Sequence, residues 1–105
     1  MNDNFKCIYK ILRTLEKAMD FQEYDFECIG HKVLEISKER WEGYIEMMCD
    51  AGYVKGVRIK EYIDGDKLFD ISEMRITLKG LEYLSENSVM QRLYNTTMGI
   101  KNIIS

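Results

Sequence analysis

The chain has 105 residues, which is the size of one ordinary domain. Hydrophobic residues make up 46% of it, enough to build a core, so the composition excludes an intrinsically disordered chain. Fifteen basic residues against 18 acidic ones give a net charge of -3, which excludes a uniformly basic nucleic-acid coat protein. The sequence shows neither an apolar run of the ~20 residues that span a bilayer nor a signal peptide, so we expect a cytoplasmic protein without a membrane partner.

Cysteine and histidine are sparse in this chain. Cys7, Cys28 and Cys49 are spaced 21 residues apart and form no C-x-x-C pair, which predicts reduced, partly buried thiols. An alternative is a zinc site made by the three cysteines and the single histidine, because Cys28 and His31 have the spacing of metal ligands. Cys7 and Cys49 flank two separate predicted helices, so we favour the thiols and expect neither a metal nor another cofactor.

The N-terminal segment has the periodicity of an amphipathic helix. Apolar residues recur at steps of three and four, which predicts a helix over residues 5–19 with one buried face. The buried face is expected to hold Phe5, Ile8, Leu12, Leu15 and Met19. The opposite face carries the basic residues Lys6, Lys10, Arg13 and Lys17.

The next segment, residues 20–36, is acidic instead of basic. Within it we expect a short strand over residues 24–28, followed by a helical turn over residues 29–34 that points Val33 and Leu34 inward.

Residues 37–51 carry a start and a stop signal for a helix. Ser37 suits an N-cap, and Gly52 suits the left-handed residue that follows a helix. We expect Trp41, Ile45 and Met48 to form the buried stripe between them.

After Gly52 the hydrophobic period changes from about four to two, which indicates strands. The apolar residues Val57, Ile59 and Ile63 alternate with Arg58, Lys60 and Tyr62. Asp64-Gly65 favours a tight two-residue turn with positive backbone angles, and a second alternating run follows it to residue 76. The pattern predicts a long β-hairpin.

Two helices are expected after the hairpin. Thr77 reads as the N-cap of a short helix that ends near residue 87, with Leu78, Leu81 and Leu84 turned inward. Gly80 inside this helix suggests close backbone packing. Ser88-x-x-Gln91 has the pattern of a capping box and opens a last helix over residues 88–105.

The expected order is helix, short helix, helix, long hairpin, helix, helix. This is the order of an α+β winged helix, in which three helices form a helix-turn-helix core and the hairpin is the wing. We therefore predict a single winged-helix domain over residues 1–105 with two further C-terminal helices. The last of them, residues 88–105, is expected to pack on the first helix or on a dimer mate.

Four segments resemble one protein family. They are Phe5-Lys-x-Ile-Tyr-Lys-Ile-Leu12, Ala51-Gly-Tyr-Val-Lys-Gly-Val57, Arg75-Ile-Thr-Leu-Lys-Gly-Leu-Glu-Tyr-Leu84 and Met98-Gly-Ile-Lys-x-Ile-Ile104. Through them nearly the whole chain resembles the YjcQ family, small winged-helix proteins of Gram-positive bacteria and their phages or prophages. The resemblance implies the fold and a phage or prophage setting, and it carries no assigned activity.

A winged helix commonly places its third helix in the major groove of DNA, but the charges here oppose that use. At ~100° per residue, Glu39, Glu46 and Asp50 face away from Trp41 and would meet phosphate. Our first hypothesis is therefore a DNA-associated regulator that contacts double-stranded DNA through the wing and the first helix. The candidate contacts are Lys10, Arg13, Lys17, Lys55, Arg58, Lys60 and Tyr62, of which Arg58, Lys60 and Tyr62 share one side of a strand.

The second hypothesis is a protein-protein interaction adaptor. In this case the acidic third helix or the apolar C-terminal helix docks on another protein or on a second copy of the chain. The residues concerned are Glu39, Glu46, Asp50, Tyr94, Ile100 and Ile104. The sequence has no P-loop, dinucleotide fingerprint or paired metal-ligand motif, so we do not expect an enzyme.

Overall fold

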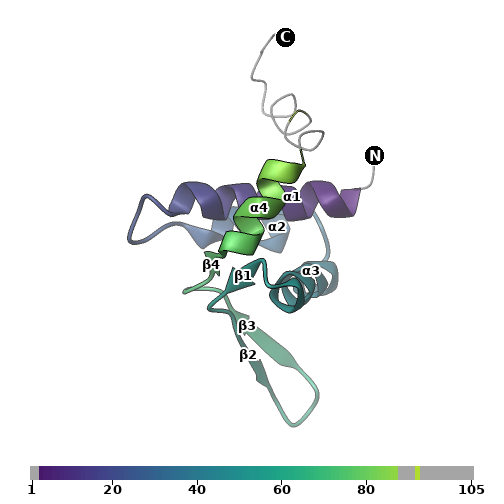
Figure 1. Cartoon of the computed structure of the whole chain (residues 1–105). Helices are drawn as coiled ribbons and strands as arrows, with labels where there is room; N and C mark the ends of the chain where they lie inside the picture. The colour runs from purple at the N-terminus through teal and green to yellow at the C-terminus, as the bar shows by residue number, and fades with distance from the viewer. Residues whose placement is uncertain (1–2, 88–91, 93–105) are drawn as a thin grey trace.

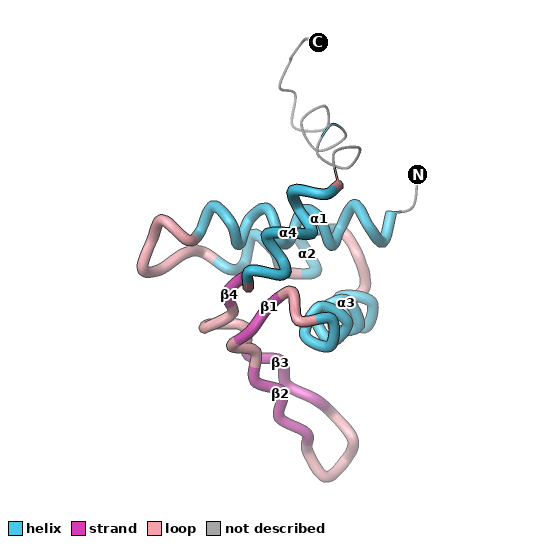
Figure 2. The backbone as a smooth tube through the Cα atoms, viewed as in Figure 1, coloured by secondary structure: helices cyan, strands magenta, loops and turns pink. Residues whose placement is uncertain are grey.

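The structure is a computed structural model, and it describes residues 3–87 and residue 92 (Figures 1 and 2). Helices and short antiparallel strands occur together, which confirms the α+β class. The elements are α1 (Asp3–Ala18), the 3-10 turn η1 (Phe26–Ile29), α2 (His31–Leu34), α3 (Lys38–Ala51), β1 (Val54–Lys55), β2 (Arg58–Glu61), β3 (Lys67–Asp70), β4 (Arg75–Ile76) and α4 (Leu78–Glu86). Over this part of the chain, every helix is too short or too polar to cross a membrane.

Helix α1 is the central element of the core. It contacts η1, α3, β4 and α4 along its length. The expected stripe is confirmed in the middle of the helix, where Leu12 and Leu15 are buried, and wrong at its ends, where Phe5 is 48% and Met19 56% exposed. The neighbouring elements cover the centre of the helix, so its two ends remain open to solvent.

The segment between α1 and α2 folds differently from the prediction. The strand expected over residues 24–28 is wrong, because η1 occupies this stretch. The Asp25 carboxylate caps it by accepting a hydrogen bond from the backbone N–H of Glu27 at 3.0 Å, and such local capping competes with extended structure. The short helix α2 is confirmed, but Val33 is exposed, contrary to the prediction, whereas Leu34 packs against the core.

Helix α3 matches the prediction closely. The Ser37 hydroxyl accepts a hydrogen bond from the N–H of Arg40 at 3.0 Å, which confirms the N-cap. At the other end, the N–H of Tyr53 donates to the carbonyl of Met48 at 2.9 Å, which is the hydrogen bond that closes a Schellman motif. Trp41, Ile45 and Met48 are buried as expected, and Tyr44 joins them.

The predicted long hairpin is present as two short antiparallel ladders. β1 pairs with β4 next to the helices, and β2 pairs with β3 farther out. The β2–β3 pair, here called the outer hairpin (residues 58–70), projects from the body of the molecule (Figures 1 and 2). Both sides of β2 are exposed, so its alternating sequence does not correspond to a buried and a solvated face.

The turn of the outer hairpin also differs from the expected one. Of Asp64 and Gly65, only Gly65 has a positive φ, at 93°. The N–H of Tyr62 donates to the carbonyl of Asp66 at 2.8 Å, so three residues form the loop where two were predicted. A three-residue loop with a left-handed glycine is the next most common solution for a hairpin.

Helix α4 closes the core above α1. The Thr77 hydroxyl accepts from the N–H of Gly80 at 3.1 Å, confirming the predicted N-cap. Leu84 is buried as expected, but Leu78, the first residue of the helix, is 73% exposed, contrary to the prediction. The C-terminal helix predicted over residues 88–105, with Tyr94, Ile100 and Ile104, lies outside the described residues.

Gly80 and Gly43 provide a matched test of this packing. A Cβ on Gly80 would lie 2.5 Å from the Tyr53 carbonyl oxygen, so we expect Gly80→Ala to lower the free energy of unfolding by about 1–3 kcal/mol. A Cβ on Gly43 would meet nothing within 4 Å, so we expect Gly43→Ala to raise the free energy of unfolding by about 0.5–1 kcal/mol. Urea unfolding measures both, and equal effects of the two substitutions would contradict the packing described here.

Candidate functional site

The outward side of α3 is acidic. Glu39 and Asp50 are exposed and Glu46 is half-buried, on the side opposite the buried Trp41. Burial raises the pKa of the Cys49 thiol, and the neighbouring carboxylates of Asp50 and Glu46 raise it further. The outward position predicted from helical geometry is confirmed for Glu39 and Asp50, and we call the three carboxylates the acidic face of α3 (Glu39, Glu46 and Asp50).

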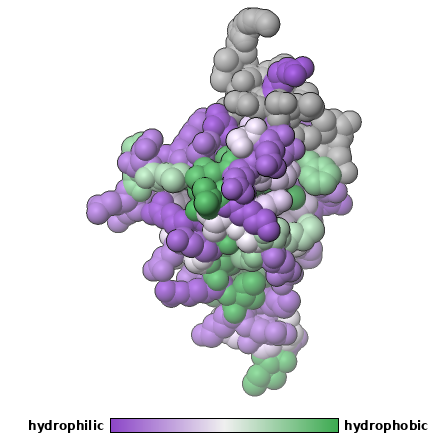
Figure 3. Space-filling view, in the orientation of Figure 1, coloured by the Kyte–Doolittle hydropathy of each residue, from purple (hydrophilic) through white to green (hydrophobic). Residues whose placement is uncertain are grey.

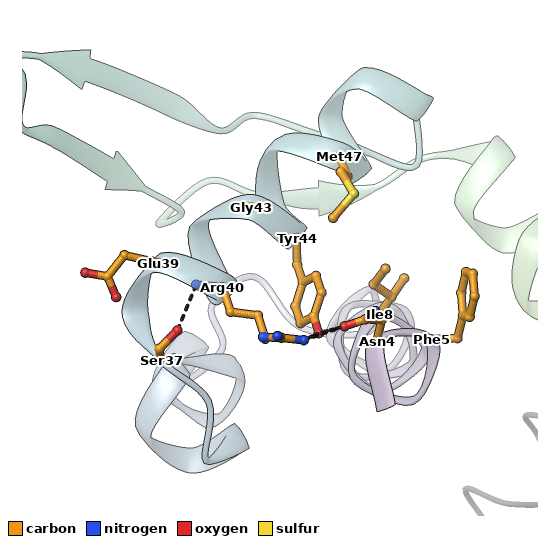
Figure 4. Close-up of a pocket in the computed structure, with 9 residues that line it drawn as sticks. All are labelled: Asn4, Phe5, Ile8, Ser37, Glu39, Arg40, Gly43, Tyr44 and Met47. Carbon is orange, nitrogen blue, oxygen red and sulfur yellow. Dashed lines mark hydrogen bonds between the residues drawn. The ribbon is translucent and has the colours of Figure 1, made fainter. Parts of the chain in front are cut away.

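An open groove of about 600 Å³ runs along one flank of this face, between α1 and α3 (Figure 4). Phe5, Ile8 and Met47 provide apolar walls, and Gly43 leaves the α3 side without a side chain. The sequence analysis missed this groove. The one feature of the sequence that pointed to the groove is Gly43, a glycine in the interior of a helix with clear start and stop signals.

The other end of the groove is polar. The Asn4 side-chain oxygen accepts hydrogen bonds from Arg40, at 2.8 Å, and from the Tyr44 hydroxyl. Ser37 and Glu39 also line this end, and the Glu39 carboxylate points away from Arg40 and Tyr44 (Figure 4). The polar end lies in the first turns of α1 and α3, where both helix dipoles are positive.

The outer hairpin lies on the opposite flank of α3 and is held there by two contacts. The Phe69 ring packs edge-on against Trp41, with the ring centroids 6.3 Å apart. Nearer the tip, the Lys67 ammonium lies 3.3 Å from the Glu46 carboxylate. These contacts orient the hairpin relative to the acidic face of α3.

The far side of the outer hairpin carries the strongest nucleic-acid candidates. The register pairs Arg58 with Asp70 and Lys60 with Leu68, so Arg58, Lys60 and Tyr62 share one side as predicted. The Lys60 ammonium lies 5.7 Å from the centre of the Tyr62 ring.

Acidic groups offset the positive charge on this side. Arg58 forms an ion pair with Glu73 at 3.2 Å, and it faces Asp70 across the ladder. Hydrogen bonds from Ser72 hold the pKa of the Asp70 carboxyl below its usual value, and Arg58 lowers it further, so Asp70 stays charged at neutral pH. Arg58 thus lies beside two carboxylates, whereas Lys60 faces Leu68 across the ladder.

The remaining candidate cations lie elsewhere in the molecule. Lys55 is in β1, opposite Arg75 of β4. Lys10, Arg13 and Lys17 are on α1, where Arg13 forms an ion pair with Glu16. The outer hairpin projects away from α1 (Figure 1), so the structure does not bring the cations of helix and hairpin into one patch.

The end of the outer hairpin is apolar, which the sequence analysis did not foresee as a surface. Ile63 is 107% exposed, and Tyr62 and Leu68 are each about half exposed. Figure 3 shows hydrophobic surface at this end of the molecule. Ile63 was expected to belong to one face of a strand, but it lies in the loop and contributes to no core.

The thiols do not gather into a metal site. Cys7, Cys28 and Cys49 form no disulfide with one another, and residues 3–87 and 92 contain no cluster of histidine, cysteine, aspartate and glutamate suited to a metal ion. Cys28 is exposed where a partly buried thiol was expected, and its S–H donates to the Asp25 carbonyl at 2.9 Å. Its thiol pKa is raised, first by burial and then by the Asp25 carboxylate.

A comparison with protein-family models places the chain. The model described as YjcQ protein matches residues 9–103, so the chain belongs to the YjcQ family. Neither the curated proteins nor the solved structures contain a match to it.

The contact between Phe69 and Trp41 can be tested directly. Since aromatic pairs add about 0.5–1.5 kcal/mol beyond area burial, we expect Phe69→Ala to lower the free energy of unfolding by about 1–3 kcal/mol. It should also change the emission of Trp41, the only tryptophan. Lys67→Ala, which removes a surface ion pair, should cost less than about 1 kcal/mol and leave the emission unchanged.

Proposed function

We propose that this YjcQ-family chain is a winged-helix protein that acts in the cytoplasm by binding another protein through α3 and the surfaces beside it. The assignment to the winged-helix class is supported by the order of α1, α2 and α3, followed by a projecting antiparallel hairpin in the place of the wing. A phage or prophage setting, implied by the family resemblance, remains a prediction.

The acidic face of α3 is the observation that supports this proposal. In a DNA-binding winged helix the outward side of the third helix enters the major groove, where affinity depends on cations that neutralise phosphates. Here that side presents Glu39, Glu46 and Asp50. Apolar groups lie on both flanks, Met47 in the groove and Ile59 on the hairpin, and a mixture of apolar and charged groups is typical of protein interfaces.

Binding rather than catalysis also fits the chemistry of the described residues. A nucleophilic cysteine needs a lowered thiol pKa, whereas the pKa values of Cys28 and Cys49 are raised.

A DNA-associated regulator is the second candidate. It is favoured by the shared side of Arg58, Lys60 and Tyr62 on the outer hairpin, which is the part of a winged helix that commonly touches the DNA backbone. The ion pair with Glu73 and the facing Asp70 weaken this candidate, because they satisfy Arg58 within the protein.

Fluorescence anisotropy with a labelled mixed-sequence DNA duplex separates the two candidates. We expect no salt-sensitive binding by the natural chain at low or moderate salt. We expect the double variant Glu39→Lys with Asp50→Lys to gain measurable duplex affinity that falls steeply as salt increases, because both positions are exposed and would then face phosphate. Glu46 is left unchanged, since it pairs with Lys67.

The variant Arg58→Ala with Lys60→Ala is the matched control. If the natural chain binds the duplex and this variant flattens the salt dependence, the outer hairpin contacts phosphates, and protein binding through α3 is not the main function. If neither protein binds while the lysine variant does, the carboxylates of α3 exclude DNA, as proposed.

A further inference from the structure

Among the glycines of the described residues, Gly43 is explained neither by close packing nor by a positive φ. It lies inside α3, its φ is not positive, and a Cβ there would meet nothing within 4 Å. By contrast, a side chain on Gly80 would collide with the backbone of Tyr53. A glycine in a helix interior lowers the free energy of unfolding by about 0.5–1 kcal/mol relative to alanine. In this protein the missing side chain leaves a groove open.

The groove has the size and lining of a binding site. Its volume of about 600 Å³ lies within the ≈300–1,000 Å³ of typical ligand pockets. Phe5 and Met47, on its two walls, are each about half exposed, so apolar surface remains unburied on both helices. Among the described residues, no segment of this chain fills the space above Gly43.

The end of the outer hairpin is complementary to this groove. It presents the fully exposed Ile63 beside Tyr62, on a turn that carries Asp64 and is followed by Asp66. Glu61 ends β2 and faces Lys67 across the ladder. The polar end of the groove holds the Arg40 guanidinium, which donates to Asn4, and the positive ends of two helix dipoles, together with the Glu39 carboxylate, which points away from Arg40. Apolar groups thus match apolar walls, and the carboxylates of the turn can face Arg40 and the two helix N-termini.

The same molecule cannot make this contact. The outer hairpin is held on one flank of α3 by the Trp41–Phe69 and Glu46–Lys67 contacts, whereas the groove opens on the other flank, between α3 and α1. A hairpin that enters the groove must therefore come from a second copy of the chain.

We propose that the groove between α1 and α3 binds the end of the outer hairpin of a second copy, with Ile63 seated above Gly43 between Phe5 and Met47. The proposal extends the proposed function, because it names one partner for the flank of α3. The exchange can be reciprocal, each chain giving its hairpin and receiving the other, which would close a two-fold dimer. A membrane is a poorer partner for Ile63, since the neighbouring carboxylates of Asp64 and Asp66 oppose an anionic lipid surface.

Sedimentation velocity of the full chain over a range of concentrations tests the proposal. We expect a concentration-dependent dimer in the natural protein. Filling the groove with Gly43→Leu should weaken the dimer at least tenfold, whereas Gly43→Ala, which leaves most of the space open, should leave it nearly unchanged. On the hairpin, Ile63→Asp should weaken it at least tenfold, and Leu78→Asp, at an exposed apolar position of α4, should not.

A cross-link identifies the contact itself. In a background with Cys28→Ser, which removes the exposed thiol, proteins carrying Ile63→Cys and Met47→Cys are mixed and oxidised. We expect a disulfide-linked heterodimer of the two variants in excess over either homodimer. Circular dichroism of each variant ensures that a loss of association is not a loss of folding.

The outcomes are distinct from those of the duplex experiment. A chain that stays monomeric up to about 1 mM, or a dimer that neither Gly43→Leu nor Ile63→Asp weakens, overturns the hairpin-in-groove contact. Cosedimentation of the natural chain, but not of Ile63→Asp, with anionic phospholipid vesicles would also overturn it in favour of a membrane. If, in addition, the chain does not bind duplex DNA, protein binding through α3 is retained as the proposed function, with a partner other than a second copy of the chain.

Discussion

The burial of Trp41 is the constraint on which the arrangement of this protein depends. Its indole N–H donates to the carbonyl of Ile29 at 2.7 Å, which ties α3 to the η1 turn, and its ring packs against Phe69, which ties α3 to the outer hairpin. A buried indole requires such a hydrogen-bond partner, because an unsatisfied N–H would cost about 1–3 kcal/mol. One side chain therefore sets which side of α3 faces inward and on which flank the hairpin lies.

The functional surfaces follow from that orientation. With Trp41, Ile45 and Met48 turned inward, helical geometry turns Glu39 and Asp50 outward, where they form an acidic face. The face separates two apolar features, the groove beside α1 and the exposed Ile59 of the outer hairpin. A helix face that presents carboxylates beside apolar groups is suited to a protein partner, and poorly suited to phosphates.

The cations of the chain are numerous but dispersed. Arg58 is paired with Glu73, Arg13 with Glu16, and Lys67 with Glu46, so each has a carboxylate partner within the protein. The guanidinium of Arg75 donates to the backbone carbonyls of Ala18 and Gln22. Arg13 and Arg58 were predicted as phosphate contacts from the sequence, but only the coordinates show that each has a carboxylate partner within the protein.

The sequence by itself determined the helices and their caps. Ser37, Thr77 and the Gly52-Tyr53 closure act through hydrogen bonds over three to five residues, and the stripe of α3 follows from its own period, so these were predictable. The acidic face of α3 was predictable for the same reason. Family membership was also readable from the sequence, since the YjcQ match extends over residues 9–103.

Only the tertiary structure decided the rest, because it depends on contacts between residues distant in sequence. The exposure of Phe5, Met19 and Leu78 reflects where neighbouring elements end, and no local pattern encodes that. The residues of β2 alternate as if one face were buried, yet every residue of this strand is exposed. The groove exists because α1 and α3 meet beside a glycine, and the exposed Ile63 becomes a possible partner for it only when both are seen in space.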